Sequence, residues 1–397
     1  MPNVNKDAYV SIAPVVNSIY EQTTGKTGIV ATDERDVVSM AQTSLQAGYD
    51  PVLKSINNVM SKTIFVDRPY SAKLLGLEVT DEEYGDHVRK ITILEKEAKD
   101  EVKYALQNGQ SVDDMKISLD EVLQTNFYGF DTLKRHDTIL RDQLDSAMES
   151  SAQLGSFLST HYTVKANEIE TDRENARRLC LLNRMATAIK NDTDTPNGQV
   201  IHLLTDYASE TGVTLTAQDV LKPANVRAFG QWAFAHIDYI AGKMGNKSTK
   251  FHQNFTGKNI TRFTPKNMMN MFMLTKYATL FDALVNANTY NDSVFNLAKV
   301  EKVDYWQSID DEAKISVTPA SVDKTGQIVE DENERPITQD LVVMTIFDKD
   351  AAGISFNRGH ITSTPMNADG DYFNNFFHQK YRLWNDTTEN AIVVVLD

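Results

Sequence analysis

The residues most suggestive of chemistry are Gly25-Lys26-Thr27, which match the end of a phosphate-binding loop. In that motif, backbone amides and a lysine hold the phosphates of a nucleotide. The full motif also needs a glycine five residues before its last glycine, and that position is Tyr20. The sequence therefore predicts no nucleotide site in this segment.

Metal-binding side chains are present but do not form a motif. Neither HExxH nor CxxC occurs, and no two histidines have the spacing of metal ligands. Asp310-Asp311-Glu312 and Asp348-Lys349-Asp350 lack the alternating Asp/Asn pattern and central glycine of a calcium loop, so we expect solvated turns. The sequence predicts no metal site. The eight histidines are His87, His136, His161, His202, His236, His252, His360 and His378.

Nucleophilic catalysis is not indicated either. No Gly-x-Ser-x-Gly elbow occurs, and the adjacent pair His136-Asp137 has no identifiable nucleophile, so we interpret it as a surface contact. The single cysteine, Cys180, lies among leucines and is expected to be a buried small hydrophobe rather than a reactive thiol. We predict no catalytic, cofactor-binding or metal-binding residues. A cytosolic α/β enzyme, with a site assembled from distant residues, stays an alternative.

The overall charge excludes broad binding to the nucleic-acid backbone. The chain has 397 residues and a formal net charge of −15, with the 41% hydrophobic fraction of a soluble globular protein. Basic and aromatic residues mix between Lys247 and Arg262, which we interpret as a hairpin with a basic face. No apolar run is long enough to span a membrane and no signal peptide is indicated, so we expect a cytosolic chain without a membrane partner.

The element most able to position other groups is a predicted helix from Ser150 to about Asn191, which contains no proline and one glycine. Such a helix would span about 60 Å, and its apolar residues form one stripe. We expect this stripe to pack on the final strand, Ile392 to Leu396, and the charged face to point to solvent or an adjacent subunit. The stripe comprises Leu154, Phe157, Leu158, Tyr162, Ile169, Ala176, Leu179, Met185 and Ile189, and the charged face comprises Glu168, Glu170, Asp172, Arg173, Glu174, Arg177 and Arg178.

The N-terminal third indicates parts that need a neighbour. The first thirty residues suggest an extended polar arm, and helices are predicted after Thr32-Asp33 and from Asp50-Pro51. From Pro69 to Asp113, short alternating stretches predict a long, charged β-hairpin. A hairpin with so little apolar surface is unstable alone and must lie on another part of this chain or on another copy. Its runs are Leu75, Leu77 and Val79, then Val88, Ile91 and Ile93, with turns at Glu82 to Gly85 and Gln107 to Gln110.

The second half predicts a compact mixed region. A helix begins near Pro223, with one apolar face. The run Met268 to Leu274 contains four methionines, which we interpret as packing surface, and Asp323 to Gln339 is expected to be an exposed loop. The helix face is Val226, Phe229, Ala233, Ile237, Ile240 and Met244, and the predicted strands are Leu341 to Phe347, Ile354 to Phe356, Tyr372 to Trp384 and Ala391 to Leu396.

This order of elements, together with several local stretches, resembles the major capsid protein of tailed double-stranded DNA bacteriophages, with the Hong Kong 97-type fold. The similarity runs over nearly the whole chain. The stretches are Gly48-Tyr49-Asp50-Pro51 leading to Ser61-Lys62-Thr63-Ile64-Phe65, then Val122 to Gly129, Ile201 to Thr205, Tyr305 to Ile309 and Trp384 to Asn390.

The resemblance implies an α+β fold with an N-terminal arm, an extended β-hairpin loop, a long spine helix, and peripheral and axial domains. We expect the arm at residues 1–50, and the extended loop with flanking peripheral-domain segments at 51–140. The spine helix of the peripheral domain is expected at 141–199, the axial domain at 200–370, and the return strands of the peripheral domain at 371–397.

The implied function is a capsid subunit that self-assembles as hexamers and pentamers into an icosahedral head around double-stranded DNA. The implied partners are a portal protein and packaged DNA held on the inner surface without sequence-specific binding, in a virion assembled in the host cytoplasm. A bacterial nanocompartment shell with the same fold is the alternative.

Two features of the family depend on details of this chain. Some relatives carry their scaffold as a cleaved N-terminal segment, but only about thirty residues precede the first predicted helix, so we expect a separate scaffolding protein. Some relatives cross-link the extended loop through a Lys and an Asn. Lys90, Lys96, Lys99 and Lys103 lie in the right region, and no motif fixes a pair.

Overall fold

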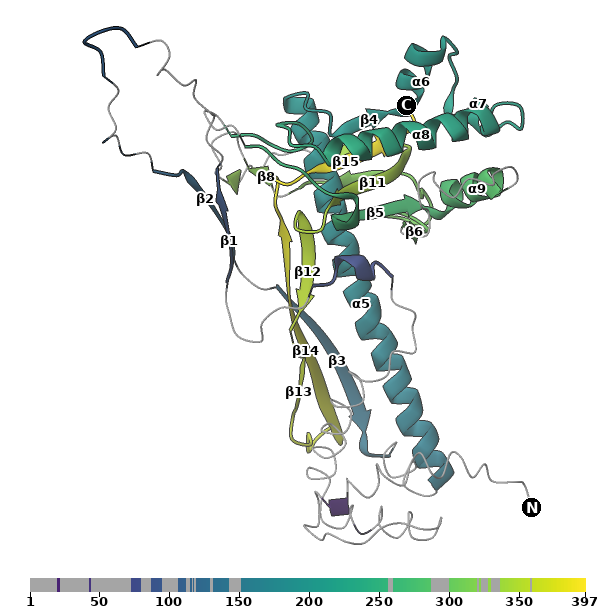
Figure 1. The fold of residues 1–397 in the computed structure, drawn as a ribbon. Helices are drawn as coiled ribbons and strands as arrows, with labels where there is room; N and C mark the ends of the chain where they lie inside the picture. The colour runs from purple at the N-terminus through teal and green to yellow at the C-terminus, as the bar shows by residue number, and fades with distance from the viewer. Residues whose placement is uncertain are drawn as a thin grey trace.

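A single long helix organises the molecule (Figure 1). One group of strands and helices gathers at its C-terminal end, a second sheet runs along its length, and a separate hairpin projects to the side. The computed structural model describes residues 20–21, 43, 73–79, 87–94, 106–111, 115, 117, 119–128, 131–142, 151–255, 260–286, 300–319, 321–322, 328–329, 336–357 and 359–397.

The long helix α5, Ser151–Asp194, confirms the predicted spine. Its buried residues Met185, Ala188 and Ile189 belong to the main hydrophobic core, and the helix contacts strand β15, Ala391–Val395, as predicted. Leu179, which the sequence predicts in the apolar stripe, is 42% exposed in the structure. The prediction that the charged face points outward is wrong for the side chains that the structure buries, because the arginines reach acceptors on other elements and the glutamates pair with arginines of the same helix. The buried side chains are Glu170, Arg173, Glu174, Arg177 and Arg178.

The core sheet contains strands from distant parts of the chain. Its order is β4-β15-β11-β5-β6, with β15 antiparallel to β11, β11 antiparallel to β5, and the outer pairs parallel. Every residue of β11 and β15 is buried, which confirms the prediction of a buried final strand. The other bounds are Val200–His202 for β4, Val342–Asp348 for β11, Met269–Leu274 for β5 and Glu301–Val303 for β6.

Helices accompany this sheet. Helix α8, Val226–Met244, buries the predicted apolar face from Phe229 to Met244, with Val226 itself half-buried. Helix α6 contacts both α8 and β4, and α9 contacts both α8 and β5. The helix bounds are Leu203–Thr211 for α6, Ala217–Val220 for α7 and Thr275–Asn286 for α9, with a short 3₁₀ turn, η2, at Lys266–Met268.

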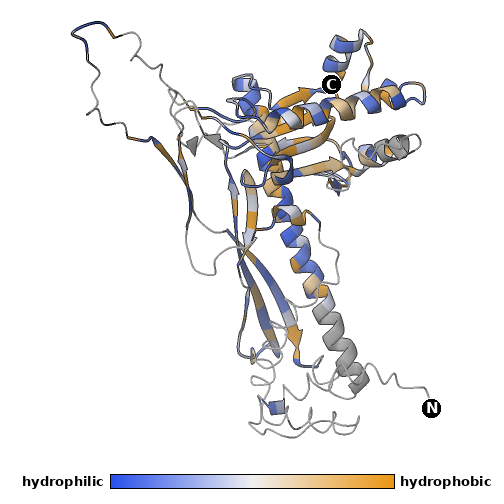
Figure 2. Ribbon diagram, in the orientation of Figure 1, coloured by the Kyte–Doolittle hydropathy of each residue, from blue (hydrophilic) through white to orange (hydrophobic). Residues whose placement is uncertain are grey.

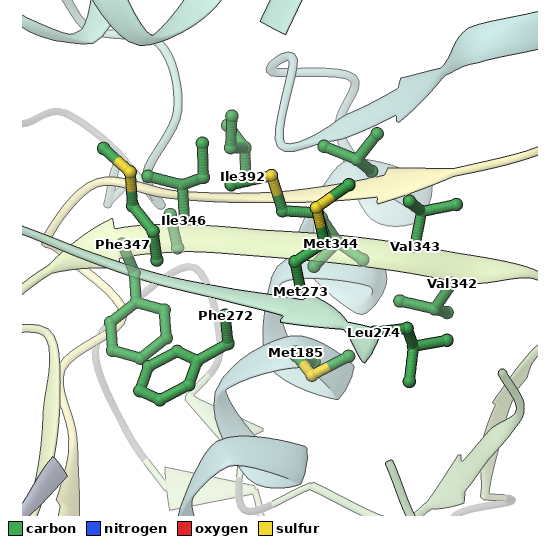
Figure 3. Packing of buried hydrophobic residues seen from close by; sticks show 14 of the residues in the cluster. Met185, Phe272, Met273, Leu274, Val342, Val343, Met344, Ile346, Phe347 and Ile392 are labelled. Atoms are coloured by element: carbon green, nitrogen blue, oxygen red, sulfur yellow. The ribbon is translucent and has the colours of Figure 1, made fainter. Parts of the chain in front are cut away.

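The centre of the core lies between α5 and this sheet (Figure 3). Met185 of α5 lies close to side chains of β5, while Phe272 of β5 stacks on Phe347 of β11 with ring centroids 5.7 Å apart. Met271 and Met273 are buried here, so the prediction that the methionine run is packing surface is confirmed. In Figure 2 the strands of this sheet are mostly apolar.

A second sheet is built around β14, Tyr372–Asn385. Strands β12, Ala352–Phe356, and β13, His360–Ser363, pair with one side of β14, and β3, Asp131–Leu140, pairs with the other. Odd-numbered residues of β14 from Phe373 to Gln379 are buried, and even-numbered ones are more exposed. The sheet therefore has one face toward α5 and one face away from it. The last two strands of the chain lie in different sheets.

The projecting hairpin pairs β1, His87–Ile93, with β2, Val122–Tyr128. The predicted turn at Gln107 to Gln110 is confirmed by the Gln110 N–H bond to the Gln107 carbonyl and by Gly109 at φ 89°. The pairing differs from the prediction, since the returning strand lies beyond Asp113. Residues 75–77 form a 3₁₀ turn, η1, instead of a strand, because Leu74 and Leu77 bury their side chains in the core.

Short strands complete the described chain. Strand β7, Ile315–Val317, pairs with β10, Ile337–Gln339, so the predicted exposed loop ends in a strand. Strands β8, Ser321–Val322, and β9, Ile328–Val329, also pair. The predicted N-terminal arm and the two helices after it lie almost entirely outside the described residues, as does most of the loop from Asp323. No helix in the described segments is long and apolar enough to cross a membrane.

Two glycines in different environments test this packing. An alanine Cβ at Gly353 on β12 would lie 2.4 Å from Cζ2 of Trp384, whereas one at Gly242 in α8 would meet no atom within 4 Å. We expect Gly353→Ala to lower the free energy of unfolding by about 1–3 kcal/mol. Gly242→Ala should raise it by about 0.5–1 kcal/mol, because glycine is unfavourable inside a helix. Urea unfolding of both variants measures the difference, and equal effects would contradict the packing.

Candidate functional site

Four arginines on α5 bury their guanidinium groups against other elements, and we call them the arginine row: Arg173, Arg177, Arg178 and Arg184. Arg177 is fully buried. Its two Nη atoms each lie 3.0 Å from Glu170 Oε1, and Nη2 also lies 2.8 Å from Glu78 Oε2. Because Glu78 follows η1, this arginine fixes the base of the extended hairpin segment to the helix.

Arg178 and Arg173 connect α5 to both sheets. Arg178 donates to the backbone carbonyls of Tyr305 and Trp306, which follow β6, and bonds Glu174 at 2.9 Å. Arg173 donates from Nε to Gln379 Oε1 on β14 at 3.0 Å. A buried charge is costly without such partners, so these hydrogen bonds favour one placement of the helix relative to its neighbours.

Arg184 holds the turn that links the two sheets. We call residues Asp386 to Asn390 the anchor turn, since they join β14 to β15, and all five are buried. Arg184 donates to Asn385 Oδ1 and the Asp386 carbonyl, both at 3.1 Å, and to the Glu389 carbonyl at 2.9 Å. Burial outweighs the nearby carboxylates and lowers the pKa of this guanidinium to about 10. It stays charged at neutral pH.

The anchor turn also closes on itself and on its surroundings. Asp386 Oδ1 accepts from the Thr388 backbone N–H at 2.9 Å and from the Thr388 hydroxyl at 2.7 Å, which makes a side-chain-stabilised turn. Asn390 donates to the Thr264 hydroxyl at 3.2 Å, and that hydroxyl donates to Asp348 at 2.7 Å. Five residues of polar sequence are thereby made rigid inside the protein.

The extended hairpin is attached at this turn. Lys90 of β1 lies 2.8 Å from Asp386 Oδ2 and 2.6 Å from Glu389 Oε1. Burial alone would lower the pKa of Lys90, but the two carboxylates outweigh it and raise that pKa. Burial raises the pKa of Glu389, whereas Lys90 and Thr388 lower that of Asp386 against the effect of its own burial. Arg262 Nε lies 3.2 Å from Glu389 and completes the cluster.

The two faces of the hairpin differ. Lys90 lies on the face turned to the anchor turn, and the adjacent positions in each strand point the other way. That outer face carries Ile91 and, as a cross-strand pair, Ile93 and Val122, with exposures of 59%, 63% and 58%. Met115, Ile117 and Leu119, in the segment leading to β2, are also strongly exposed. The three exposed apolar side chains that share the outer face are typical of a surface that another molecule covers.

The candidate chemical residues of the sequence are not brought together. Gly25-Lys26-Thr27 lies outside the described residues. His136 is exposed and bonds Asn374, whereas Asp137 pairs with Lys165, so the predicted surface contact is confirmed for the histidine. The described residues contain no group of three or more His, Cys, Asp or Glu that could hold a metal ion.

The acidic stretches and the cysteine have structural surroundings. Asp310 and Asp311 are exposed, as predicted for a turn. Asp348 is instead buried, because it accepts from Thr264 and from the Asp350 backbone N–H. Cys180 is buried and lies 3.4 Å from the Gly353 carbonyl, and burial raises the pKa of its thiol to about 12. The predicted burial of this thiol is confirmed, and the raised pKa disfavours the reactive thiolate.

The basic segment and Lys90 both contact the anchor turn. Backbone bonds between Ser248 and Arg262 form an isolated antiparallel bridge at the ends of the predicted hairpin, and residues 256–259 between them lie outside the described residues. Its His252 is buried and contacts Asn390 of the anchor turn at 3.1 Å. Burial lowers the pKa of this imidazole. Lys90 is held by carboxylates of its own chain, while Lys96, Lys99 and Lys103 lie outside the described residues.

Comparisons with known proteins agree with this arrangement. One chain in the capsid structure of Staphylococcus phage Andhra aligns over 81% of this chain and 83% of its own, with 10% identity and a TM-score of 0.53. A chain in the structure of the head fiber and inner core protein of native bacteriophage P68 aligns over the same shares, with 12% identity and a TM-score of 0.51. No curated protein sequence matches.

The fold is therefore that of phage capsid proteins of the Hong Kong 97 type. The chain is a phage major capsid protein, a building block of the shell. Residues 12–395 match the model of the Phi29-like phage major capsid protein family, and the chain belongs to that family.

The arginine row predicts a large cost for removing a single side chain. Arg184→Met leaves the carbonyls of Asp386 and Glu389 without their donors, so we expect about 3–5 kcal/mol lower stability in urea unfolding. Arg141→Met, at a side chain that is 39% exposed, should cost less than about 1 kcal/mol. Arg184→Lys keeps the positive charge but loses the two guanidinium nitrogens that bond the anchor turn, so its loss of stability should lie between the other two. Equal losses for Arg184→Met and Arg141→Met would contradict the role of the row.

The raised pKa of Lys90 predicts that the ammonium group holding the hairpin stays charged up to high pH. Since the pKa of Lys90 is raised, its contribution is complete below the ordinary lysine pKa of 10.5 and is lost only as pH rises through the higher folded value. Lys90→Met should expose β1 to limited proteolysis at neutral pH, whereas the wild-type hairpin stays protected. Lys349→Met, at an exposed lysine between β11 and β12, is the matched control. Unchanged cleavage in Lys90→Met would show that the ion pairs do not hold the hairpin.

Proposed function

We propose that this chain forms the icosahedral head enclosing the double-stranded DNA genome of a tailed phage, assembled as hexamers and pentamers. The observation that carries the proposal is the outer face of the β1–β2 hairpin, where Ile91, Ile93 and Val122 are exposed together. Lys90 holds the opposite face against the chain's own anchor turn. A second copy could cover the outer face while Lys90 keeps the inner face attached to the anchor turn of its own chain.

The geometry supports a closed ring of such contacts. The hairpin projects to the side of the molecule (Figure 1), so a second copy would receive it with a different part of its surface, in a head-to-tail contact. Head-to-tail contacts generate rings when the rotation between copies closes. The attachment at the anchor turn would hold the base of the hairpin at the same place in every copy.

The domain division follows the two sheets. We propose that α5 with β3, β12, β13 and β14 forms the peripheral domain, and that the five-stranded sheet with α6 to α9 forms the axial domain. The expected return segment 371–397 is then divided, with β14 peripheral and β15 axial, because β15 pairs with β4 and β11. The anchor turn becomes the junction between the domains.

Partners and location belong to the same proposal. We expect a separate scaffolding protein, a portal protein, assembly in the host cytoplasm, and DNA held without sequence-specific contacts. The net charge of −15 supports weak contact with DNA, since an acidic wall does not bind the phosphate backbone tightly. We propose a structural role without catalysis. It is supported by the buried arginines of α5, whose hydrogen bonds connect the helix to other elements of the fold.

The alternatives have less support. A nanocompartment shell has the same fold, but the family match of residues 12–395 is to a phage capsid protein. An α/β enzyme would need polar groups that are free to act on a substrate, whereas among the described residues Arg177 bonds Glu170 of the same helix, and Arg184 and Lys90 bond the anchor turn.

Assembly can be tested at the outer face of the hairpin. We expect the purified wild-type chain, with a co-expressed scaffold candidate, to form rings or shells in negative-stain images. Ile93→Lys should abolish them, because a charge at this position could not be buried against another copy, while urea unfolding of the monomer stays unchanged. Gln231→Lys adds the same charge on the exposed side of α8 and serves as the control.

Two outcomes would contradict the proposal. Persistent compact monomers of the wild-type chain in the presence of scaffold would count against a shell role. Normal shells from Ile93→Lys would show that the outer face of the hairpin is not an assembly contact.

A further inference from the structure

The tripeptide Asn-Gly-Gln occurs twice in the chain, in two different environments. The first copy is Asn108-Gly109-Gln110, in the turn of the extended hairpin, and the second is Asn197-Gly198-Gln199, between α5 and β4. Both glycines have a positive φ, at 89° and 82°. Because the residues are identical and the two φ angles are similar, a large difference in chemical behaviour between the copies would come from the surrounding structure.

An asparagine followed by glycine can react with its own main chain. The backbone nitrogen of the glycine attacks Cγ of the asparagine side chain, the Cγ–Nδ2 bond breaks, and ammonia leaves with the proton of the glycine nitrogen. The product is a five-membered succinimide ring, which water then opens. Opening at Cγ gives aspartate, and opening at the main-chain carbonyl carbon gives isoaspartate. Glycine favours the attack because it has no Cβ to obstruct it and its backbone rotates freely.

The hairpin turn leaves the first copy open to this reaction. Residues 106–111 are exposed, and they lie at the outer end of the projecting hairpin (Figure 1). The bond from the Gln110 N–H to the Gln107 carbonyl closes the turn, at 3.0 Å. Among the described residues, no hydrogen bond occupies the Asn108 side chain or the Gly109 N–H, and a Cβ added at Gly109 would meet no atom within 4 Å. The attacking nitrogen and the amide carbon are therefore accessible to each other and to water.

The second copy is held in a network that opposes the same attack. The Gly198 N–H donates to Asp192 Oδ1 at 2.8 Å. The same oxygen accepts from the backbone N–H groups of Asn197 and Gln199, each at 3.0 Å. Asn197 Nδ2 donates to Gln199 Oε1 at 2.9 Å and to the His252 carbonyl at 3.2 Å. Attack would break a hydrogen bond to a carboxylate and would also require rotation of a side chain that two further bonds hold in place.

We propose that Asn108 is a site of spontaneous modification, at which the hairpin turn converts its own asparagine to aspartate and isoaspartate, while Asp192 protects Asn197. The reaction takes place within a single chain, needs only water as co-reactant, and does not depend on the proposed shell assembly. Each product adds one negative charge to the turn, and isoaspartate also lengthens the main chain by one methylene group. The charge of the hairpin therefore changes with the age of the protein.

Peptide mass spectrometry of the purified full chain, sampled during storage at neutral pH, tests the proposal. The mass gain identifies deamidation, and chromatographic retention separates the aspartate and isoaspartate products. We expect Asn108 to react at least about tenfold faster than Asn197, since the second copy must first break a bond to a carboxylate. In urea both environments are lost, so the two rates should become similar. Equal rates in the native chain, or a slower reaction at Asn108, would overturn the proposal.

Asp192→Ala tests the protection of the second copy. Loss of the carboxylate frees the Gly198 N–H, so Asn197 should react at least about tenfold faster in the native variant, with Asn108 unchanged. Asp192→Asn keeps an acceptor oxygen and should lie between the wild type and Asp192→Ala. Asp194→Ala, at an exposed carboxylate of the same helix, is the matched control, and urea unfolding shows that each variant is folded. An unchanged rate at Asn197 in both Asp192 variants would overturn the protective role.

Asn108→Gln tests the ring-forming step. Its side chain is longer by one methylene group, so the attack would close a larger and less favourable ring, and we expect conversion at this position to stop on the same timescale. Direct attack of water on the side-chain amide would convert both residues alike. Equal conversion of the two, or a wild-type product without isoaspartate, would overturn the succinimide route. A difference between Asn108 and Asn197 that persists in urea would overturn the structural origin of the selectivity.

Discussion

The structure depends on the burial of four guanidinium groups along one side of α5. Removing such a charge from water costs several kcal/mol, and hydrogen bonds to well-placed acceptors offset that cost. Those acceptors come from the segment after η1, from the chain after β6, from β14 and from the anchor turn. The arginine row therefore sets the positions of both sheets relative to the helix, and it discriminates against arrangements that apolar packing alone would tolerate.

This rigidity has a consequence for assembly. A shell subunit makes many weak contacts, and each is stronger when the parts that make it are already ordered. Arg184 holds the anchor turn from the inside and Lys90 attaches the hairpin to the same turn from the outside. Ion pairs of Lys90 with the anchor turn thus hold the base of the hairpin against the body, and its apolar outer face stays exposed.

Much of this fold could be predicted from local patterns, whereas the site could not. Proline-free length predicted α5, helical spacing predicted α8, and a run of β-branched residues predicted β15 as a buried strand. The charged side of α5 was misplaced because periodicity does not distinguish a solvated arginine from one whose partners lie over a hundred residues away. The strand after the hairpin turn was missed for a related reason, since the pairing of Ile93 with Val122 spans a long segment without regular spacing. The stretch Trp384 to Asn390 carried the useful signal, through its family resemblance.

The central claim is that the C-terminal half of α5, the anchor turn and β15 form one cooperative unit held by buried arginines. Native-state hydrogen exchange at increasing denaturant tests it most directly, because it gives an opening free energy for each amide. The account predicts that amides around Arg177 and Arg184 open with the same free energy and the same denaturant dependence as those of Val393 and Val394. Exchange of the helix at low denaturant, while β15 stays protected, would contradict it.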